Sequence, residues 1–348
     1  MSDFFDSVGR RSRLAIVAQL NIPVSEVSVD VTALKGGYIA SVFRLHLSYA
    51  EDESKPEYPS TAIIKYDSGQ AGEMNAIAKA LDLYGREYYF YSAIRDQCPI
   101  EAPKFMGIMM DEAGAKPEGL ILEDLGDFVQ FSGDFRAIVT ACAQMHNHFW
   151  GRPSFELLKL PNDPHLFQPK WGEFVRHRWP IFRQKWDGIL SEQQLTIGDA
   201  IAQNFERIQN ALSSPPLTLV HGDVKLGNLH TRFKDGLPVP CFLDWQYIVA
   251  GKGVQDVVFC MVESYDNPDQ EEWKQTYLNV LGRPEYSRKQ LDKDWSLALC
   301  HFPIYVCVWF GILPDEELTD PAFPPRFIMR TFNALIKYNI ASLLKELQ

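Results

Sequence analysis

Apolar and polar residues alternate along two stretches near the start of the chain. The apolar positions of these stretches are Val27, Val29 and Val31, followed by Phe43, Leu45, Leu47 and Tyr49. A period of two predicts half-buried strands, and the glycines between the stretches, within residues 35–38, predict a hairpin turn. Further strands are expected over 61–66, 105–110 and 120–122, and a helix over about 71–95. This first part therefore predicts a small antiparallel sheet with one prominent helix.

The pattern changes after Gly126, where apolar residues begin to recur at helical spacing. The expected helices cover 135–149 and then, approximately, 165–190, 195–213, 252–265, 268–281 and 288–345. Three short strands are expected among them, over 217–220, 229–233 and 239–243. Asp235 and Gly236 form a turn signal between the last two strands. The sequence thus predicts an α+β fold with a sheet-rich domain over 1–121, a connector over 122–127 and a mainly helical domain over 128–348.

Composition narrows the classes of function. The chain has 348 residues and a net charge of −11, and it lacks the basic footprint of a protein that binds nucleic acid. Its six cysteines show no C-x-x-C spacing, which favours reduced thiols and an intracellular protein. The longest apolar stretch, residues 302–313, is shorter than the ~20 residues of a membrane span. We expect a cytoplasmic protein without a secretory signal or membrane contact, whose oligomeric state is not readable.

The densest run of chemically functional residues is HGDVKLGN, residues 221–228, directly after a predicted strand. Asp223 and Asn228 share this loop, and Asp244 ends the last strand of the following pair. Phosphoryl transfer from ATP requires a divalent metal ion that neutralises charge on the phosphates, and a group that accepts the proton of the attacking hydroxyl. Mg²⁺ prefers carboxylate and amide oxygens for the first task, and one aspartate can perform the second.

Six segments in order resemble the motifs of the aminoglycoside phosphotransferase/choline kinase-like superfamily. They are KGGYIASVFR (35–44), AIIK (62–65), REYYFY (86–91), LILEDL (120–125), HGDVKLGN (221–228) and LDWQ (243–246). The resemblance implies a protein-kinase-like fold of two lobes, with an antiparallel sheet in the first and the catalytic loop and acceptor site in the second. It also implies ATP and Mg²⁺ as cofactors and a small hydroxylated molecule as substrate. The motifs are closest to those of the ecdysteroid-kinase-like branch, although residues 225–228 are more similar to the branch fused to acyl-CoA dehydrogenases.

The resemblance assigns roles on the catalytic loop. Asp223 would be the catalytic base, and Asn228 and Asp244 would hold Mg²⁺. Lys225 would steady the transferred phosphoryl group, where a cation offsets charge on the phosphate oxygens. By the same resemblance, Asp256 would brace the loop.

The resemblance also assigns roles in the first domain. Lys65 would contact the α- and β-phosphates of the nucleotide and form an ion pair with Glu87. Glu73 lies on the same expected helix, so the choice between the two glutamates stays open.

The remaining nucleotide contacts that the resemblance implies come from a turn and from the connector. Gly36, Gly37 and Ser41 would cover the phosphates. Backbone groups of Glu123 and Leu125 would meet the adenine. The preference for ATP over GTP is not readable.

Other interpretations stand beside these roles. The resemblance implies a structural hydrogen bond for His221. We expect His146 to be packed and hydrogen-bonded because it falls on the apolar stripe of its helix. An inactive nucleotide-binding module is the alternative function, and a metal-dependent phosphoesterase would need more His and Asp ligands than the sequence offers. The aromatic residues of the second domain favour an apolar or aromatic alcohol as the acceptor, although core packing explains most of them equally well.

Overall fold

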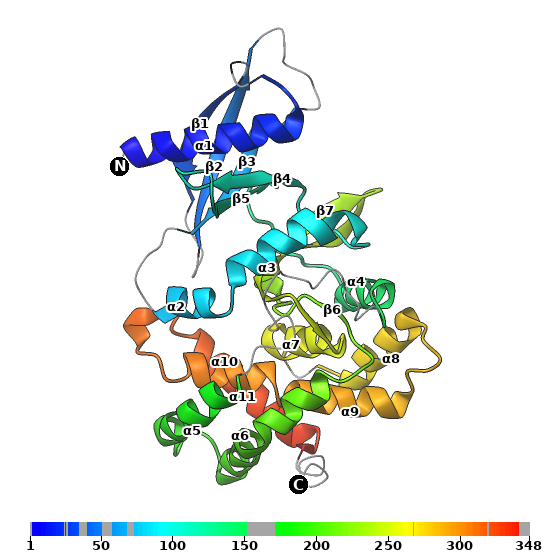
Figure 1. The fold of residues 1–348 in the computed structure, drawn as a ribbon. Helices are drawn as coiled ribbons and strands as arrows, with labels where there is room; N and C mark the ends of the chain where they lie inside the picture. The colour runs from blue at the N-terminus through cyan, green and yellow to red at the C-terminus, as the bar shows by residue number, and fades with distance from the viewer. Residues whose placement is uncertain are drawn as a thin grey trace. The chain divides into compact units, whose positions relative to one another are not determined.

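The computed structural model describes residues 2–23, 25, 27–34, 40–50, 58–67, 73–151, 171–266, 268–318 and 320–340 (Figure 1). Two compact units are present. The first comprises Met1–Gln97 with Ala102–Val129, and the second comprises Cys98–Glu101 with Gln130–Gln348. The predicted connector over 122–127 therefore falls inside the first unit.

The first unit contains a five-stranded antiparallel sheet with the strand order β1-β2-β3-β5-β4. The strands are β1 (Val27–Ala33), β2 (Ser41–Tyr49), β3 (Thr61–Tyr66), β4 (Phe105–Met110) and β5 (Pro117–Glu123). The alternation that predicts β2 also orients it: Phe43, Leu45 and Leu47 are buried, whereas His46 and Ser48 are exposed. The buried side chains form one core cluster with residues of the neighbouring strands, including Ile64 and Ile121.

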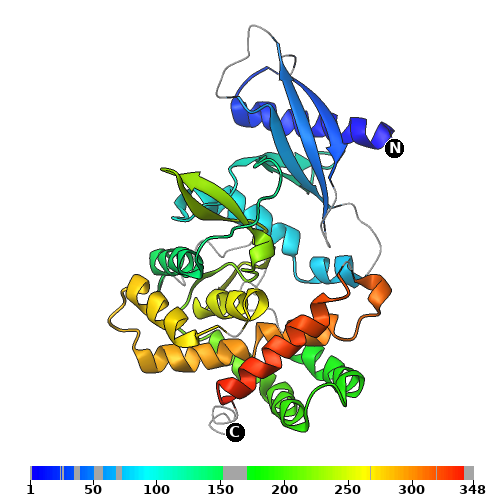
Figure 2. The same cartoon turned by 180° about the vertical axis from the view of Figure 1, so that it is seen from behind.

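Helix α1 (Ser2–Leu20), which the sequence analysis did not predict, packs on β1 and β4 of this sheet. Figure 2 shows it behind the blue strands. Val8 and Ile16 are fully buried in the core cluster, but charged residues between them hide the apolar stripe. Arg11 is one of these, and its Nη1 donates to the carbonyl of Met110 at 2.9 Å and contacts the Glu118 carboxylate. The charged residues of α1 thus bind the edge of the sheet.

The helix predicted over about 71–95 is divided. It consists of α2 (Glu73–Ala80) and α3 (Leu83–Tyr89), followed by a π-helical turn, Phe90–Ile94, and a 3₁₀ turn. Asp82 has φ = 51° at the break between α2 and α3. A left-handed residue cannot continue a right-handed helix, so this position separates the two.

The second unit is mainly helical. Its helices are α4 (Phe135–His148), α5 (Gly172–Trp186), α6 (Glu192–Leu212), α7 (Val254–Ser264), α8 (Gln270–Leu281), α9 (Arg288–Leu299), α10 (Phe302–Phe310) and α11 (Phe323–Lys337). Within its described residues, the stretch predicted as helical over 288–345 contains the three α-helices α9, α10 and α11. Prolines stand in the first turn of α10 and of α11, where the missing N–H costs no hydrogen bond.

Two short antiparallel sheets lie among these helices. The predicted hairpin is β7 (Leu229–Lys234) with β8 (Leu237–Phe242). Strand β6 (Thr218–Val220) pairs instead with β9 (Val249–Gly251), which was not predicted. Because β6 leads into residues 221–228, this pairing fixes one end of the loop that carries Asp223.

The core of the second unit is rich in aromatic side chains. All eight tryptophans of the chain belong to this unit. Trp179 and Trp186 are nearly fully buried and stack on Phe182 of the same helix, with ring centroids 5.3 and 5.8 Å apart. All six cysteines are buried free thiols. Within the described part of the chain, no helix is both long and apolar enough to span a membrane.

Candidate active site

In the first unit, β3 and α3 place a lysine and a glutamate in contact. The Lys65 ammonium lies 2.7 Å from both carboxylate oxygens of Glu87. The Glu87 side chain is 4% exposed and that of Lys65 is 17% exposed, so this ion pair is largely shielded from water. Glu87 is therefore the partner of Lys65, and the side chain of Glu73 lies outside the described residues.

The segment after β5 is held to the same sheet. Arg44 on β2 binds the Asp124 carboxylate through Nε at 2.7 Å and Nη2 at 3.3 Å, and the Gly126 N–H donates to the same carboxylate at 2.9 Å. The backbone N–H of Glu123 donates to the carbonyl of Lys104 at 2.9 Å. The N–H of Glu123 is therefore already paired within this unit, and the expected contacts of Glu123 and Leu125 with adenine stay predictions.

The other expected nucleotide contacts of this unit are only partly described. Ser41 is the first residue of β2, opposite Tyr66 on β3, and it is half-buried. Leu125 follows β5 and is also half-buried. Gly36 and Gly37 lie outside the described residues, so their expected role in covering phosphates stays a prediction.

In the second unit, a tight turn shapes the loop after β6. Gly222 has φ = 88°, a conformation that residues with a side chain rarely adopt. A Cβ atom built at Gly222 would lie 2.3 Å from the carbonyl oxygen of Tyr247. The position therefore requires glycine, because both the backbone conformation and the close approach of Tyr247 exclude a side chain.

His221 forms hydrogen bonds to backbone with both of its ring nitrogens. Nδ1 accepts from the N–H of Asp223 at 3.2 Å, and Nε2 donates to the carbonyl of Leu243 at 3.0 Å. Burial lowers the pKa of His221, in keeping with this neutral form. The expected structural role is confirmed, because no ring nitrogen is left to act as a base.

A buried carboxylate on α7 holds the backbone of the loop. Asp256 is 0% exposed. Its Oδ2 accepts the N–H of His221 at 2.9 Å, and its Oδ1 accepts the N–H of Gly222 at 2.8 Å. His146 on α4 donates from Nε2 to the same Oδ2 at 3.1 Å, and its Nδ1 contacts the Tyr277 hydroxyl at 3.1 Å. His146 is thus packed and hydrogen-bonded, as predicted.

Asp223 lies between a cation and an amide. Both of its carboxylate oxygens contact the Lys225 ammonium, at 3.0 and 2.8 Å. The side-chain amide of Asn228 donates to Oδ2 of Asp223 at 2.9 Å and to its backbone carbonyl at 3.0 Å. Burial, together with the charge of Asp244, raises the pKa of Asp223 to about 6 although Lys225 opposes the shift. Asp223 is therefore an ionised but poorly solvated carboxylate near neutral pH.

Asp244 follows β8 and has φ = 64°. Strain of this kind costs about 1–3 kcal/mol and is concentrated at functional sites. The N–H of Leu243 donates to the carbonyl of Asn228 at 2.8 Å, which joins this segment to the catalytic loop. The structure thus places Asp223 and Asn228 in contact, and the charge of Asp244 contributes to the raised pKa of Asp223.

These side chains suit a magnesium ion that is shared with phosphate. Because both donor contacts of the Asn228 amide go to Asp223, its carbonyl oxygen is directed elsewhere and can act as a ligand. With the Asp244 carboxylate, it would supply two hard oxygen ligands to such an ion. The described residues contain no cluster of three or more His, Cys, Asp or Glu side chains fit for a metal. Mg²⁺ commonly takes only one or two protein ligands and completes its shell with phosphates and water.

The comparison with known families agrees with this geometry. A family model described as "Phosphotransferase enzyme family" matches residues 114–291, more than half of the chain. The chain belongs to this family. The predicted superfamily of aminoglycoside phosphotransferases and choline kinases is thereby confirmed, whereas the closer resemblance to ecdysteroid kinases stays a prediction.

Solved structures of phosphotransferases share the fold. Choline kinase from Cryptosporidium parvum Iowa II is 14% identical, with 96% of this chain and 97% of that chain covered and a TM-score of 0.54. Ethanolamine kinase from Plasmodium vivax is 13% identical, with 89% and 82% covered and a TM-score of 0.50. The GDP complex of wild-type aminoglycoside 2'-phosphotransferase-IIIa is 10% identical, with 93% and 97% covered and a TM-score of 0.54. The predicted α+β, protein-kinase-like fold is confirmed. A search of the curated proteins finds no match.

Several residues of this phosphotransferase's loop region were not found from the sequence. Tyr277 orients His146, and the Ser264 hydroxyl accepts the N–H of Leu226 at 3.0 Å. Both act through contacts between residues far apart in the chain, and no local pattern marks them. His301 could have been noticed from the sequence, because it is a single polar side chain next to the apolar stretch 302–313.

Proposed function

We propose that the protein is an ATP-dependent phosphotransferase that moves the γ-phosphate to a hydroxyl of a small molecule. Membership in the phosphotransferase family supports the reaction class. The observation that carries the proposal is the Asp223 carboxylate. It is buried, it contacts Lys225 and Asn228, and the charge of Asp244 contributes to its raised pKa. A poorly solvated carboxylate of raised pKa is suited to accept a proton near neutral pH.

In the proposed reaction, Asp223 accepts the proton of the acceptor hydroxyl while that oxygen attacks the γ-phosphorus. A new P–O bond forms, the bond to the β-bridging oxygen breaks, and ADP leaves with the electron pair. The Lys225 side chain is partly exposed. Its ammonium can therefore contact the transferred phosphoryl group as well as Asp223 and offset the charge on the phosphoryl oxygens. Positioning and electrostatic stabilisation account for most of the catalysis in such reactions.

Asn228 and Asp244 would hold the Mg²⁺ ion. When bound, the ion neutralises charge on the phosphate oxygens. In the first unit, Lys65 binds the α- and β-phosphates, and Glu87 keeps its ammonium in place. An aminoglycoside phosphotransferase of similar fold has been solved as a GDP complex. The assay therefore compares ATP with GTP as the phosphate donor.

A turnover assay tests the function. The full chain is incubated with γ-labelled ATP or GTP, Mg²⁺ and a panel of uncharged and amino alcohols, and labelled phosphate monoester is measured. Formation of monoester on at least one alcohol supports the proposal. Nucleotide binding by thermal shift, without transfer to any alcohol and without hydrolysis, favours the inactive nucleotide-binding module.

Replacing Lys65 by methionine should weaken Mg-ATP binding about 10- to 100-fold, because a charge-assisted contact to phosphate is worth about 1.5–3 kcal/mol. Calorimetric titration of the folded protein with Mg-ATP measures the change. Lys79→Met, at an exposed position of α2, is the matched control and should bind normally. Equal affinities of Lys65→Met and wild type would contradict the assignment.

Replacing Asp244 by asparagine should raise the Mg²⁺ concentration for half-maximal turnover by at least about 10- to 100-fold, because the loss of a residue that merely supports a metal ligand already costs that much. Asparagine tolerates the left-handed backbone of this position, so the loop keeps its shape. Asp266→Asn, an exposed position just after α7, serves as the control. An unchanged Mg²⁺ dependence in Asp244→Asn would remove Asp244 from the metal site.

A further inference from the structure

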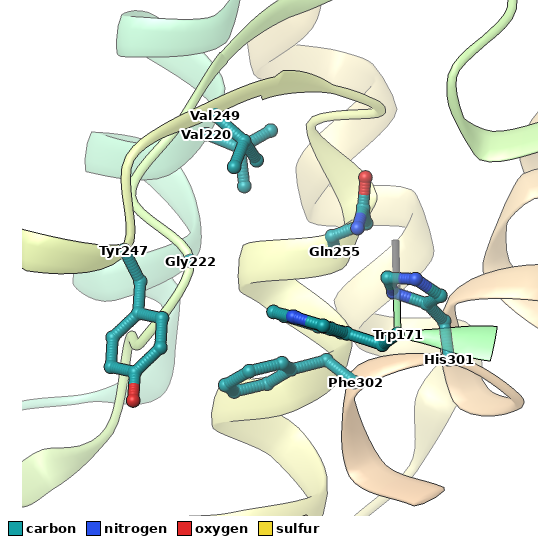
Figure 3. Close-up of a pocket in the computed structure, with 8 residues that line it drawn as sticks. All are labelled: Trp171, Val220, Gly222, Tyr247, Val249, Gln255, His301 and Phe302. Carbon is teal, nitrogen blue, oxygen red and sulfur yellow. The ribbon is translucent and has the colours of Figure 1, made fainter. Parts of the chain in front are cut away.

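A pocket in the second unit lies against the loop that carries Asp223. Its lining residues are Trp171, Val220, Gly222, Tyr247, Val249, Gln255, His301 and Phe302 (Figure 3). Gly222, the neighbour of Asp223, is half-buried, whereas His301 at the start of α10 is 0% exposed. The charges of Asp223 and Asp244 contribute, after burial and Tyr305, to the raised pKa of the Tyr247 hydroxyl. One wall of the pocket is thus shared with the candidate active site, and His301 forms its deep end.

His301 is buried without a hydrogen-bond partner. Within the described residues, neither of its ring nitrogens has a partner, and the same is true of the indole nitrogen of Trp171. The imidazole is stacked between Trp171 and Phe205, with centroid distances of 5.3 Å on both sides. Its faces are therefore covered by rings, and only its edge can meet a polar atom. Leaving such groups unpaired costs about 1–3 kcal/mol each, which indicates a ligand or water.

The chemistry of the pocket selects for an uncharged group. Burial lowers the pKa of His301 to about 3, so its ring is neutral at physiological pH and offers one donor and one acceptor. No Asp, Glu, Lys or Arg is among the lining residues that the structure describes. Apolar side chains and aromatic rings form most of the wall (Figure 3). Among these lining residues an ammonium group would find no counter-charge, whereas a carbonyl or hydroxyl oxygen could accept from the indole N–H of Trp171 and from the ring N–H of His301.

We propose that this pocket binds the far end of the acceptor, and that His301 and Trp171 select an uncharged apolar molecule that carries a carbonyl or hydroxyl oxygen at that end. That the ligand is a phosphate acceptor rests on the proposed function, whereas binding of a molecule to the pocket can be measured without turnover. The cavity is about 20 Å³ in volume. That is room for about one water molecule, so the cavity lined by these eight residues, Gly222 included, admits a single polar group of the acceptor while the rest of the molecule stays outside it.

Binding is tested with cyclohexanone, which has an apolar ring and one carbonyl and cannot be phosphorylated. The protein is labelled with ¹⁵N-histidine, and the ring signals of its eight histidines are recorded. The signal lost in His301→Phe belongs to His301, and phenylalanine preserves the stacking between Trp171 and Phe205. We expect cyclohexanone to shift the His301 signal in a saturable manner, and cyclohexylammonium, of the same shape but charged, to leave it unchanged.

Variants separate recognition from packing. The affinity for cyclohexanone, measured by calorimetry, should fall about 3- to 10-fold in Trp171→Phe, the loss expected for one neutral hydrogen bond. Trp150→Phe, outside the pocket, should bind as the wild type does. Failure of cyclohexanone to bind, equal binding by cyclohexylammonium, or unchanged affinity in Trp171→Phe and His301→Phe would overturn the proposal, since the nitrogens would then serve only buried water.

Turnover gives an independent result. With uncharged ring alcohols that carry a second oxygen, His301→Phe should raise KM about 3- to 10-fold and leave kcat unchanged. If the wild type phosphorylates no alcohol but binds cyclohexanone at His301, the pocket stands and the proposed function falls. If it phosphorylates amino alcohols with a KM that ignores His301→Phe, the function stands and the pocket proposal falls.

Discussion

Replacing Asp223 by asparagine should lower kcat about 100- to 10,000-fold, the range that a positioned general base contributes. Asparagine keeps the size of the side chain and can still accept from Asn228 and Lys225, but it cannot take a proton from the acceptor. The loss should therefore appear in kcat, whereas the Kd for Mg-ATP changes little. Single-turnover transfer of labelled phosphate, with a parallel nucleotide titration, measures both quantities.

Asp235→Asn is the matched control for this change. Asp235 is exposed in the β7–β8 turn with φ = 51°, a conformation that asparagine tolerates, so this variant should keep the wild-type kcat. Turnover by Asp223→Asn within about tenfold of the wild type would show that Asp223 only orients the hydroxyl or plays no part.

Replacing Asp256 by alanine should destabilise the second unit by about 3 kcal/mol or more, because each buried donor that loses its acceptor costs about 1–3 kcal/mol. The change leaves three buried donors without their acceptor: the backbone N–H groups of His221 and Gly222, and Nε2 of His146. Urea unfolding followed by tryptophan fluorescence reports on this unit alone, because every tryptophan of the chain belongs to it. The midpoint should fall with little change in slope.

Asp294→Ala distinguishes loss of stability from loss of the loop geometry. Asp294 is 1% exposed, accepts hydrogen bonds from Tyr286 at 2.9 Å and Gln290 at 2.8 Å, and lies 3.8 Å from the Lys252 ammonium; none of these partners belongs to the loop over 221–228. Both variants should lose stability, but under conditions where each stays folded only Asp256→Ala should lose kcat. Normal kcat in folded Asp256→Ala would mean that the loop keeps its shape without this brace.

Local patterns were sufficient for most of the sheet and helices. The alternation around Phe43 and Leu45 predicts β2 because one face of that strand is buried against the core and the other is in water. Helix α1 escaped prediction since Arg11 and its charged neighbours bind the sheet edge and interrupt the apolar stripe. Strand β9 escaped because three residues carry too little pattern, and its pairing with β6 is set by the packed unit.

The candidate site was predictable to the extent that its residues share one stretch of chain. Asp223, Lys225 and Asn228 lie within six positions, and the structure shows them in contact. The choice of Glu87 as the partner of Lys65 needed the arrangement of α3 against β3. The pocket at His301 joins segments that are distant in sequence, so no spacing along the chain could reveal it.

The bracing of the catalytic loop has a consequence for the order of refolding. The loop's two central N–H groups depend on Asp256, which lies 34 and 35 positions away, and Asp256 in turn contacts His146 across 110 positions. Contacts of long sequence separation form slowly because closing the intervening chain costs entropy. Secondary structure therefore returns before the loop has its final form, and regain of activity marks the late steps of assembly.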